Sequence, residues 1–307
     1  MKINYFFILT FFATANMLQA SQVEQKIASE VQRQATPLEL KMIDEAASGT
    51  LTEAKLKQYL HAGAGINAKG NYGYTALILA ARSGQTAITQ QLITAGADLN
   101  YKNTLGNTAL ILATDTGHTE IAQQLIAAGA DINTKNKLGD TALMWAVRNG
   151  HTAITQQLIT ANADLNAKNS DGDTALLWTA YHGHTAIAQQ LIAAGANIEV
   201  KNNNGYTALI WAARNGHTDI VKRLIAAGTN PNICNEKDGN KTARDHARDK
   251  DAYDKAVAAG LAERKAHITK IIEEERHLIP VLSNIVTEYV VGPLDAPESK
   301  KQDKEKK

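Results

Sequence analysis

The strongest constraint on the fold of this chain is a segment that recurs every 33 residues. Five copies align without gaps and begin at Gly70, Asn103, Asn136, Asn169 and Asn202. Each copy carries a glycine, then Thr-Ala-Leu, then a second glycine, and closes with a Leu-Ile pair. Such self-similarity predicts a repeat architecture, because one short unit cannot bury its apolar face alone and must stack on its neighbours.

The first copy illustrates how these residues set the local structure. Gly73 permits a tight turn with positive φ, and Thr75 is placed to cap a short apolar helix with its hydroxyl. Gly84 is expected to end this helix in the left-handed conformation. A second helix follows, with Ile88 and Leu92 on one face. Each copy is therefore predicted to fold as turn, helix, turn, helix.

These copies resemble the repeats of ankyrin proteins. The family pattern Gly-x-Thr-Pro-Leu-His-x-Ala appears as Gly-Asp-Thr-Ala-Leu-Met-Trp-Ala in residues 139–146, and Gly150-His151, Leu158-Ile159 and an Ala-Asp-Leu-Asn turn follow. In every copy alanine replaces the family's proline, and an aliphatic residue replaces its first histidine. Alanine still favours a helix at that position, so neither change alters the predicted fold.

The resemblance implies an all-α ankyrin-repeat solenoid of stacked helix-turn-helix units over residues 38–267, with additional C-terminal helices. This domain divides into an N-terminal cap over 38–69, five full repeats over 70–234 and a C-terminal cap over 235–267. The flanking segments are predicted to be an N-terminal polar helix over 21–37, C-terminal helices over 268–292 and a disordered charged tail over 293–307. A polar closing unit is expected, because the end of a solenoid faces water.

Residues 1–20 have the pattern of a secretory signal peptide. Lys2 precedes an apolar run from Tyr5 to Ala13, and small residues lead to Ala20 and a polar chain. The run is too short to span a bilayer, which takes about 20 apolar residues. We expect cleavage after Ala20, with cleavage after Ala15 as the alternative. The protein is then exported, either periplasmic or secreted, with no membrane span after cleavage.

The charge balance and the reactive residues argue against several function classes. The chain has 32 basic and 31 acidic residues, and removal of Lys2 with the signal leaves the two balanced, so no nucleic-acid partner is expected. Cys234 is the only cysteine and can form neither an internal disulfide nor a paired thiolate site. The sequence has no glycine-rich phosphate loop and no nucleophile elbow. We therefore expect no enzymatic activity, no metal and no cofactor.

Three residue types that can carry chemistry recur in step with the repeat. The histidines are His118, His151, His184 and His217. The tryptophans are Trp145, Trp178 and Trp211, and the lysines are Lys102, Lys135, Lys168 and Lys201.

Each of these columns also has a structural explanation. Stacked helices lie about 8–10 Å apart, too far for successive histidines to share a metal ion about 2 Å from each, so we interpret the histidines as braces of the turn between helices. The tryptophans stand where earlier copies have leucine and are expected to pack against the neighbouring repeat. The first three lysines each follow an aspartate by four residues, namely Asp98, Asp131 and Asp164, and are expected to pair with it.

Positions that vary while the rest repeats indicate a binding surface. Ankyrin proteins as a family bind partners through turn tips and the exposed side of the first helix, and tyrosine and arginine suit interface anchors. The resemblance therefore implies a non-catalytic protein-protein interaction scaffold, expected to be a monomer. The candidate partner-binding residues are Tyr72, Tyr74, Arg82, Leu105, Asp115, Leu138, Asp140, Arg148, Asp171, Asp173, Tyr181, His182, Tyr206 and Arg214.

Two alternative functions remain open at this stage. Residues 279–291 are faintly similar to the opening helix of an F-box, which would make the protein an exported effector that recruits host machinery. The same segment would otherwise cover the apolar end of the solenoid. The chain is then either the scaffold described above or a structural periplasmic accessory protein.

Overall fold

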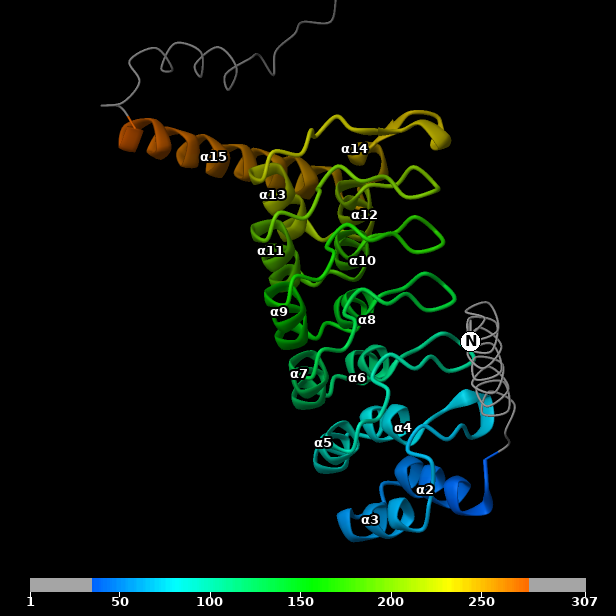
Figure 1. Ribbon diagram of the computed structural model, residues 1–307. Helices are drawn as coiled ribbons and strands as arrows, with labels where there is room; N and C mark the ends of the chain where they lie inside the picture. The colour runs from blue at the N-terminus through cyan, green and yellow to red at the C-terminus, as the bar shows by residue number, and fades with distance from the viewer. Residues whose placement is uncertain (1–34, 276–307) are drawn as a thin grey trace, which may run out of the picture. The chain divides into compact units, whose positions relative to one another are not determined.

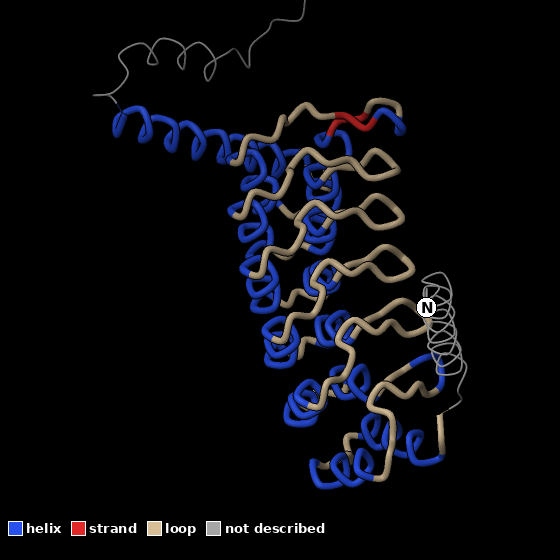
Figure 2. Tube along the Cα trace, viewed as in Figure 1, coloured by secondary structure: helices blue, strands red, loops and turns tan. Residues whose placement is uncertain are grey.

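The computed structural model of the protein describes residues 35–275, which are mostly helical (Figures 1 and 2). The expected signal peptide, nearly all of the polar helix over 21–37, the F-box-like segment 279–291 and the charged tail lie outside the described residues. Within residues 35–275, no helix is both long and apolar enough to span a bilayer. The chain divides into two compact units between Ala142 and Leu143.

Unit 1 is a stack of helix pairs. Its elements are α2 (Pro37–Ser48), α3 (Glu53–His61), the 3-10 turn η1 (Asn71–Gly73), α4 (Ala76–Arg82), α5 (Thr86–Thr94), α6 (Ala109–Thr116) and α7 (Thr119–Ala127). Helices α2, α4 and α6 pack in one layer, and α3, α5 and α7 pack in a second (Figure 1). Fully buried aliphatic residues such as Leu77, Ile111 and Leu125 fill the space between the layers.

Unit 2 continues the same pattern of helix pairs along the chain. Its elements are α8 (Ala142–Arg148), α9 (Thr152–Thr160), α10 (Ala175–His182), α11 (Thr185–Ala193), α12 (Ala208–Asn215), α13 (Thr218–Ala226), β1 (Cys234–Asn235), the 3-10 turn η2 (Glu236–Asp238), β2 (Lys241–Thr242), α14 (Ala243–His246) and α15 (Lys250–Glu275). Helices α10, α12 and α14 form one layer, and α9, α11 and α13 form the other. The two short strands pair antiparallel in the closing repeat (Figure 2).

The local signals of the repeat act as the sequence predicts. The Thr108 hydroxyl accepts a hydrogen bond from the Ile111 N–H at 3.3 Å, which caps α6. Gly117 then ends α6 with φ +81°, a conformation that costs glycine little. Both features recur in α12, where Thr207 caps the first turn and Gly216 ends the helix. The prediction of an all-α fold of stacked helix-turn-helix units is confirmed.

The last described helix, α15, differs from the prediction. The sequence was expected to break between a cap ending at residue 267 and further helices, but α15 runs unbroken over 26 residues. Gly260 does not interrupt it, because α15 contains no proline and many strong helix formers. A Cβ at Gly260 would lie 2.9 Å from the Cβ of Ile225 in α13. Glycine at this position therefore allows α15 to pack closely on α13.

Candidate functional site

Within each unit, recurring histidines contact the repeat that precedes them. In unit 1, His118 Nε2 lies 3.0 Å from the Arg82 carbonyl oxygen, and in unit 2 His184 Nε2 lies 3.3 Å from that of Arg148. Because a carbonyl oxygen only accepts, Nε2 carries the proton in these bonds. A Cβ at Gly150 would lie 2.8 Å from the His184 ring, so the ring occupies the space that glycine leaves open. The interpretation of the histidines as braces is confirmed at these positions.

The lysine column has a different partner from the one expected. Lys102 Nζ donates to the Lys135 carbonyl oxygen of the next turn at 3.1 Å. The Asp98 carboxylate instead accepts from the Asn100 N–H at 3.0 Å and closes its own turn. The predicted pairing of Lys102 with Asp98 is wrong, because the aspartate is used within its turn. Lysine at this position ties successive turns together.

The candidate partner-binding residues of unit 1 are most exposed at the turn tips. Tyr72, Leu105 and Leu138 have exposed fractions of 76%, 58% and 61%. Arg82 is also exposed on α4, whereas Tyr74 and Asp115 are half-buried. Asp140 is only 6% exposed and offers a partner little surface. Its backbone N–H donates to the Asn136 side chain at 2.9 Å, as part of the turn.

The candidates of unit 2 gather instead along the first helices. Tyr181 is 42% exposed, and His182, Arg148 and Arg214 are exposed as well, whereas the exposed Asp171 stands at a turn tip. Tyr206 and Asp173 are half-buried. We call the depression that these helices form the aromatic groove; its cavity is about 460 Å³ and is lined by Arg148, Asp173, Leu177, Trp178, Tyr181, His182 and Trp211.

Aromatic rings in contact with one another build the floor of this groove. Tyr181 meets Trp211 edge to face, with ring centroids 4.9 Å apart and planes at 83°. Trp178 stacks on His182 at 5.6 Å and 12°. Offset and edge-to-face pairs of this kind hold aromatic rings in place. The tryptophans thus contact the neighbouring repeat as expected, but they are half-buried and form part of the surface.

Two arginines lie against this aromatic floor. The Arg148 guanidinium carbon is 5.0 Å from the Trp145 ring centroid and 5.2 Å from that of Trp178. The Arg214 guanidinium is 5.4 Å from the Trp211 centroid, and its Nη1 donates to the Tyr206 hydroxyl at 2.9 Å. These cation–π contacts fix the two cations while leaving their residues exposed.

The remaining ionisable groups of the aromatic groove carry little positive charge. Burial lowers the pKa of His182, and the neighbouring His184 and Arg148 lower it further, so this imidazole is neutral at neutral pH. The Asp173 carboxylate accepts from the Asn202 amide at 2.7 Å. The groove is therefore an aromatic surface with Arg148 in its lining and with Arg214 beside it, against the Trp211 ring.

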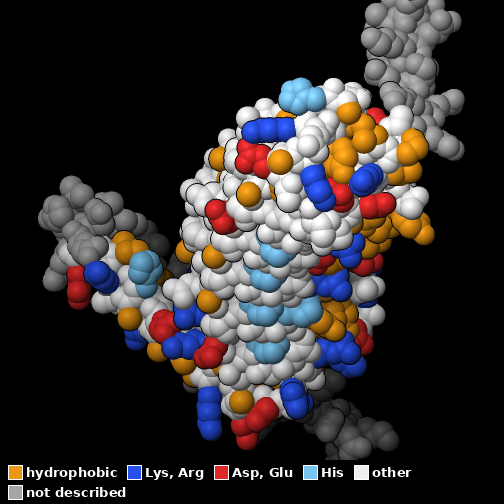
Figure 3. All heavy atoms as spheres, turned by 90° about the horizontal axis from the view of Figure 1, so that it is seen from below, with side chains coloured by type: hydrophobic (Ala, Val, Ile, Leu, Met, Phe, Trp, Pro, Cys, Tyr) orange, Lys and Arg blue, Asp and Glu red, His pale blue; other side chains and the backbone are white. Residues whose placement is uncertain are grey.

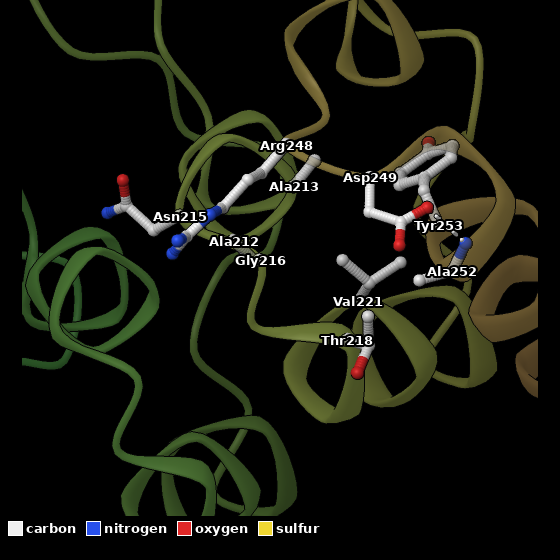
Figure 4. A pocket seen from close by; sticks show the side chains of 10 residues that line it. All are labelled: Ala212, Ala213, Asn215, Gly216, Thr218, Val221, Arg248, Asp249, Ala252 and Tyr253. Atoms are coloured by element: carbon white, nitrogen blue, oxygen red, sulfur yellow. Dashed lines mark hydrogen bonds between the residues drawn. The ribbon is translucent and has the colours of Figure 1, made fainter.

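A second cavity of unit 2, about 570 Å³ in volume, lies between α12, α13 and the start of α15 (Figure 4). The Arg248 side chain lies beside Gly216 as a histidine ring lies beside the corresponding glycine of earlier repeats, because its Cδ would be 3.4 Å from a Cβ at Gly216. The backbone N–H of Arg248 donates to the Ala213 carbonyl at 3.1 Å. Burial raises the pKa of Tyr253 to about 12, and the hydroxyl donates to the Pro231 carbonyl. These contacts close the last repeat and do not assemble an acid–base pair.

Sequence reasoning identified most of the aromatic groove but missed its floor. Trp178 and Trp211 were assigned to packing, although the change from leucine in the earlier copies was visible. Histidine side chains also reach the surface beside hydrophobic and cationic side chains (Figure 3). Within residues 35–275, no group of three or more histidine, cysteine or acidic side chains is placed to hold a metal ion.

Comparison with known families supports the repeat assignment. A family model described as ankyrin repeats (3 copies) matches residues 45–136 and 143–235, which together make up more than half of the chain. A second model, described as ankyrin repeats (many copies), matches residues 116–159. A search of curated proteins found no match.

Proposed function

The chain belongs to the ankyrin-repeat family, and from this premise we propose that it is a non-catalytic scaffold that binds another protein. Ankyrin repeats are generally protein-protein interaction modules. The observation that carries the proposal is the aromatic groove of unit 2. Tyrosine, tryptophan and arginine are the residue types that dominate the energetics of protein interfaces; here Tyr181 and Arg148 are held in place and exposed, and Trp178 is half-exposed beside them.

The packing of the chain explains why this surface is available for a partner. The histidine braces, threonine caps and glycine turns fix the repeat, so they leave few positions free to vary. The free positions are the turn tips and the outer side of the first helices. A preorganised surface loses less conformational entropy on binding than a flexible one, which favours affinity.

Site-specific photo-crosslinking tests this proposal. A photoreactive phenylalanine analogue placed at Tyr181 should form an adduct with one discrete protein in extracts of the source cell. The matched control is the same analogue at Gln156, an exposed residue on the polar face of α9. Equal labelling at both positions, or no adduct at position 181 together with turnover of a small substrate, would contradict the proposal.

We also propose that the protein is exported. The proposal rests on the charged, apolar and small-residue regions of residues 1–20. N-terminal sequencing of the protein purified from its source should begin at Ser21, or at the residue after Ala15. A soluble cytosolic form that retains Met1 would overturn this proposal and would leave the binding function untouched.

A further inference from the structure

The two arginines of the aromatic groove define what kind of partner segment fits there. Each guanidinium lies against aromatic rings, and within residues 35–275 neither Arg148 nor Arg214 forms an ion pair with a carboxylate. An arginine held in this way keeps its outer N–H groups directed to solvent, where a planar carboxylate is the matching acceptor.

The spacing of the arginines adds a second constraint. Arg148 ends α8 and Arg214 lies near the end of α12, and α10 stands between these helices in the stack (Figure 1). Neighbouring helices pack about 8–10 Å apart, so the two guanidinium groups are separated by roughly 16–20 Å. An extended peptide covers about 3.3 Å per residue, so roughly five or six residues bridge that distance.

The aromatic rings between the two arginines determine which side chain fits at the middle of the bound segment. Trp178, Tyr181 and Trp211 line the cavity there, and their apolar rings suit one large aromatic or aliphatic side chain. Asp173 and the neutral His182 are the other ionisable groups of the lining. The carboxylate of Asp173 disfavours the continuous negative charge of a nucleic acid at this point.

On this basis we propose that the aromatic groove binds an extended protein segment with two acidic side chains about six residues apart and one large apolar side chain between them. The proposal rests on the function proposed above and names the chemical class of its partner. Main-chain atoms of the segment are not needed for this recognition, because the two ion pairs and the apolar anchor set its register.

Fluorescence anisotropy with designed peptides provides the test. The probe is a labelled heptapeptide, Glu-Gly-Gly-Phe-Gly-Gly-Glu, and the reference peptide carries glutamine at both ends. The whole protein should bind the acidic probe at least about tenfold more tightly than the glutamine peptide. Arg148→Gln and Arg214→Gln should each weaken binding of the acidic probe about fivefold and leave the glutamine peptide unaffected.

Arg82→Gln in unit 1 is the matched control. Arg82 occupies the same helix position as Arg148 and Arg214. The residue three positions before it is Leu79, however, whereas a tryptophan precedes each of the other two arginines. This variant should bind both peptides as the original protein does. Thermal melts should show that all three variants stay folded, with Arg148→Gln and Arg214→Gln lowered slightly because they lose their contacts with the aromatic rings.

Three results with the peptides would overturn the proposal, and a fourth comes from a competitor. The three are equal affinity for the two peptides, an equal loss in the Arg82→Gln variant, and no binding of the acidic probe up to about 1 mM. A labelled ten-nucleotide oligothymidine serves as a further competitor, and tighter binding of this strand than of the peptide also overturns it. An intact crosslink at position 181 alongside any of these results would leave the scaffold function standing and reject only the acidic partner.

Discussion

The two units use one repeat to present different surfaces. In unit 1 the exposed apolar side chains are at the turn tips, where Tyr72 and Leu105 stand. The corresponding tips of unit 2 carry Asp171 and Asn204, and its exposed aromatic residues lie along the first helices instead. The braces and caps are the same in both. The repeat therefore fixes the backbone and leaves two separate sets of positions on which a binding surface can be placed.

The largest expected effect tests whether the two cores are equivalent. Leu125 in α7 and Leu191 in α11 occupy the same repeat position, and both are fully buried. Substitution of either by alanine should lower the free energy of unfolding by about 2–5 kcal/mol. Urea unfolding followed by circular dichroism measures this. A loss in one unit and none in the other would contradict the view that the units differ only at the surface.

Two glycines in unit 2 allow the cost of backbone strain to be measured apart from the cost of a clash with the histidine brace. Gly183 and Gly195 both have φ +86°, but a Cβ at Gly183 would lie 2.5 Å from the His217 ring and one at Gly195 would meet nothing within 4 Å. Gly195→Ala should cost about 1–2 kcal/mol for the left-handed conformation alone. Gly183→Ala should cost about 1–3 kcal/mol more, because the added methyl group overpacks the contact.

The brace itself provides the control for that comparison. In a protein that already carries His217→Ala, the two glycine substitutions should have nearly equal effects on the free energy of unfolding. A difference that persists without the imidazole would place its origin outside the brace.

One repeat position carries leucine in unit 1 and tryptophan in unit 2, and exchanging the two residues should make the surface of one unit resemble that of the other. Trp178→Leu gives unit 2 the residue that unit 1 has at Leu79, and it removes one face of the Arg148 contact. We expect a loss of about 1–2 kcal/mol in stability with the fold retained. The reverse change, Leu79→Trp, should leave stability within about 0.5 kcal/mol of the original. Denaturant melts and near-ultraviolet circular dichroism report on both, and unfolding of Trp178→Leu would mean that the ring is a core residue.

The smallest expected effect is a pH dependence that His182 gives to unit 2. Burial lowers its pKa in the folded protein below the ordinary value of about 6.5, so the unfolded chain binds the proton more readily. Stability contributed by the neutral ring is present above that value and is lost as the pH falls below it. His182→Gln should therefore reduce the change in urea midpoint between about pH 7.5 and pH 5.5. An unchanged difference would show that other groups cause it.

Particular residues show how far the sequence could be interpreted. Thr108 and Gly117 act through their nearest neighbours in the chain, so the helix they delimit was predictable. The packing of Trp178 was predicted but its partial exposure was not, because that exposure depends on how the next helix is packed beside it. Asp140 was expected at the surface, but its turn folds back and buries it. Side-chain exposure and partner choice thus depend on contacts between repeats, which a single repeat's sequence does not specify.

The same reasoning explains the departures at the lysine column and at α15. Asp98 is close to Lys102 in sequence, but it has a nearer N–H donor in its own turn. The length of α15 follows from strong helix formers and from packing on α13, and neither produces a boundary near residue 267. The sequence showed that residues vary at the turn tips and along the first helices. It did not show that the exposed apolar residues lie at the tips in unit 1 and along the helices in unit 2.

The affinity for the crosslinked partner tests the central claim most directly. Its dissociation constant should be measured for the original protein, for a unit 2 variant with Trp178→Leu and Trp211→Leu, and for a unit 1 variant with Leu105→Ser and Leu138→Ser. Interface anchors are each worth about 2 kcal/mol or more, so the unit 2 variant should bind at least about 100-fold more weakly, while the unit 1 variant should change less than about threefold. The reverse pattern, or equal losses in both variants, would contradict the assignment of partner binding to the aromatic groove.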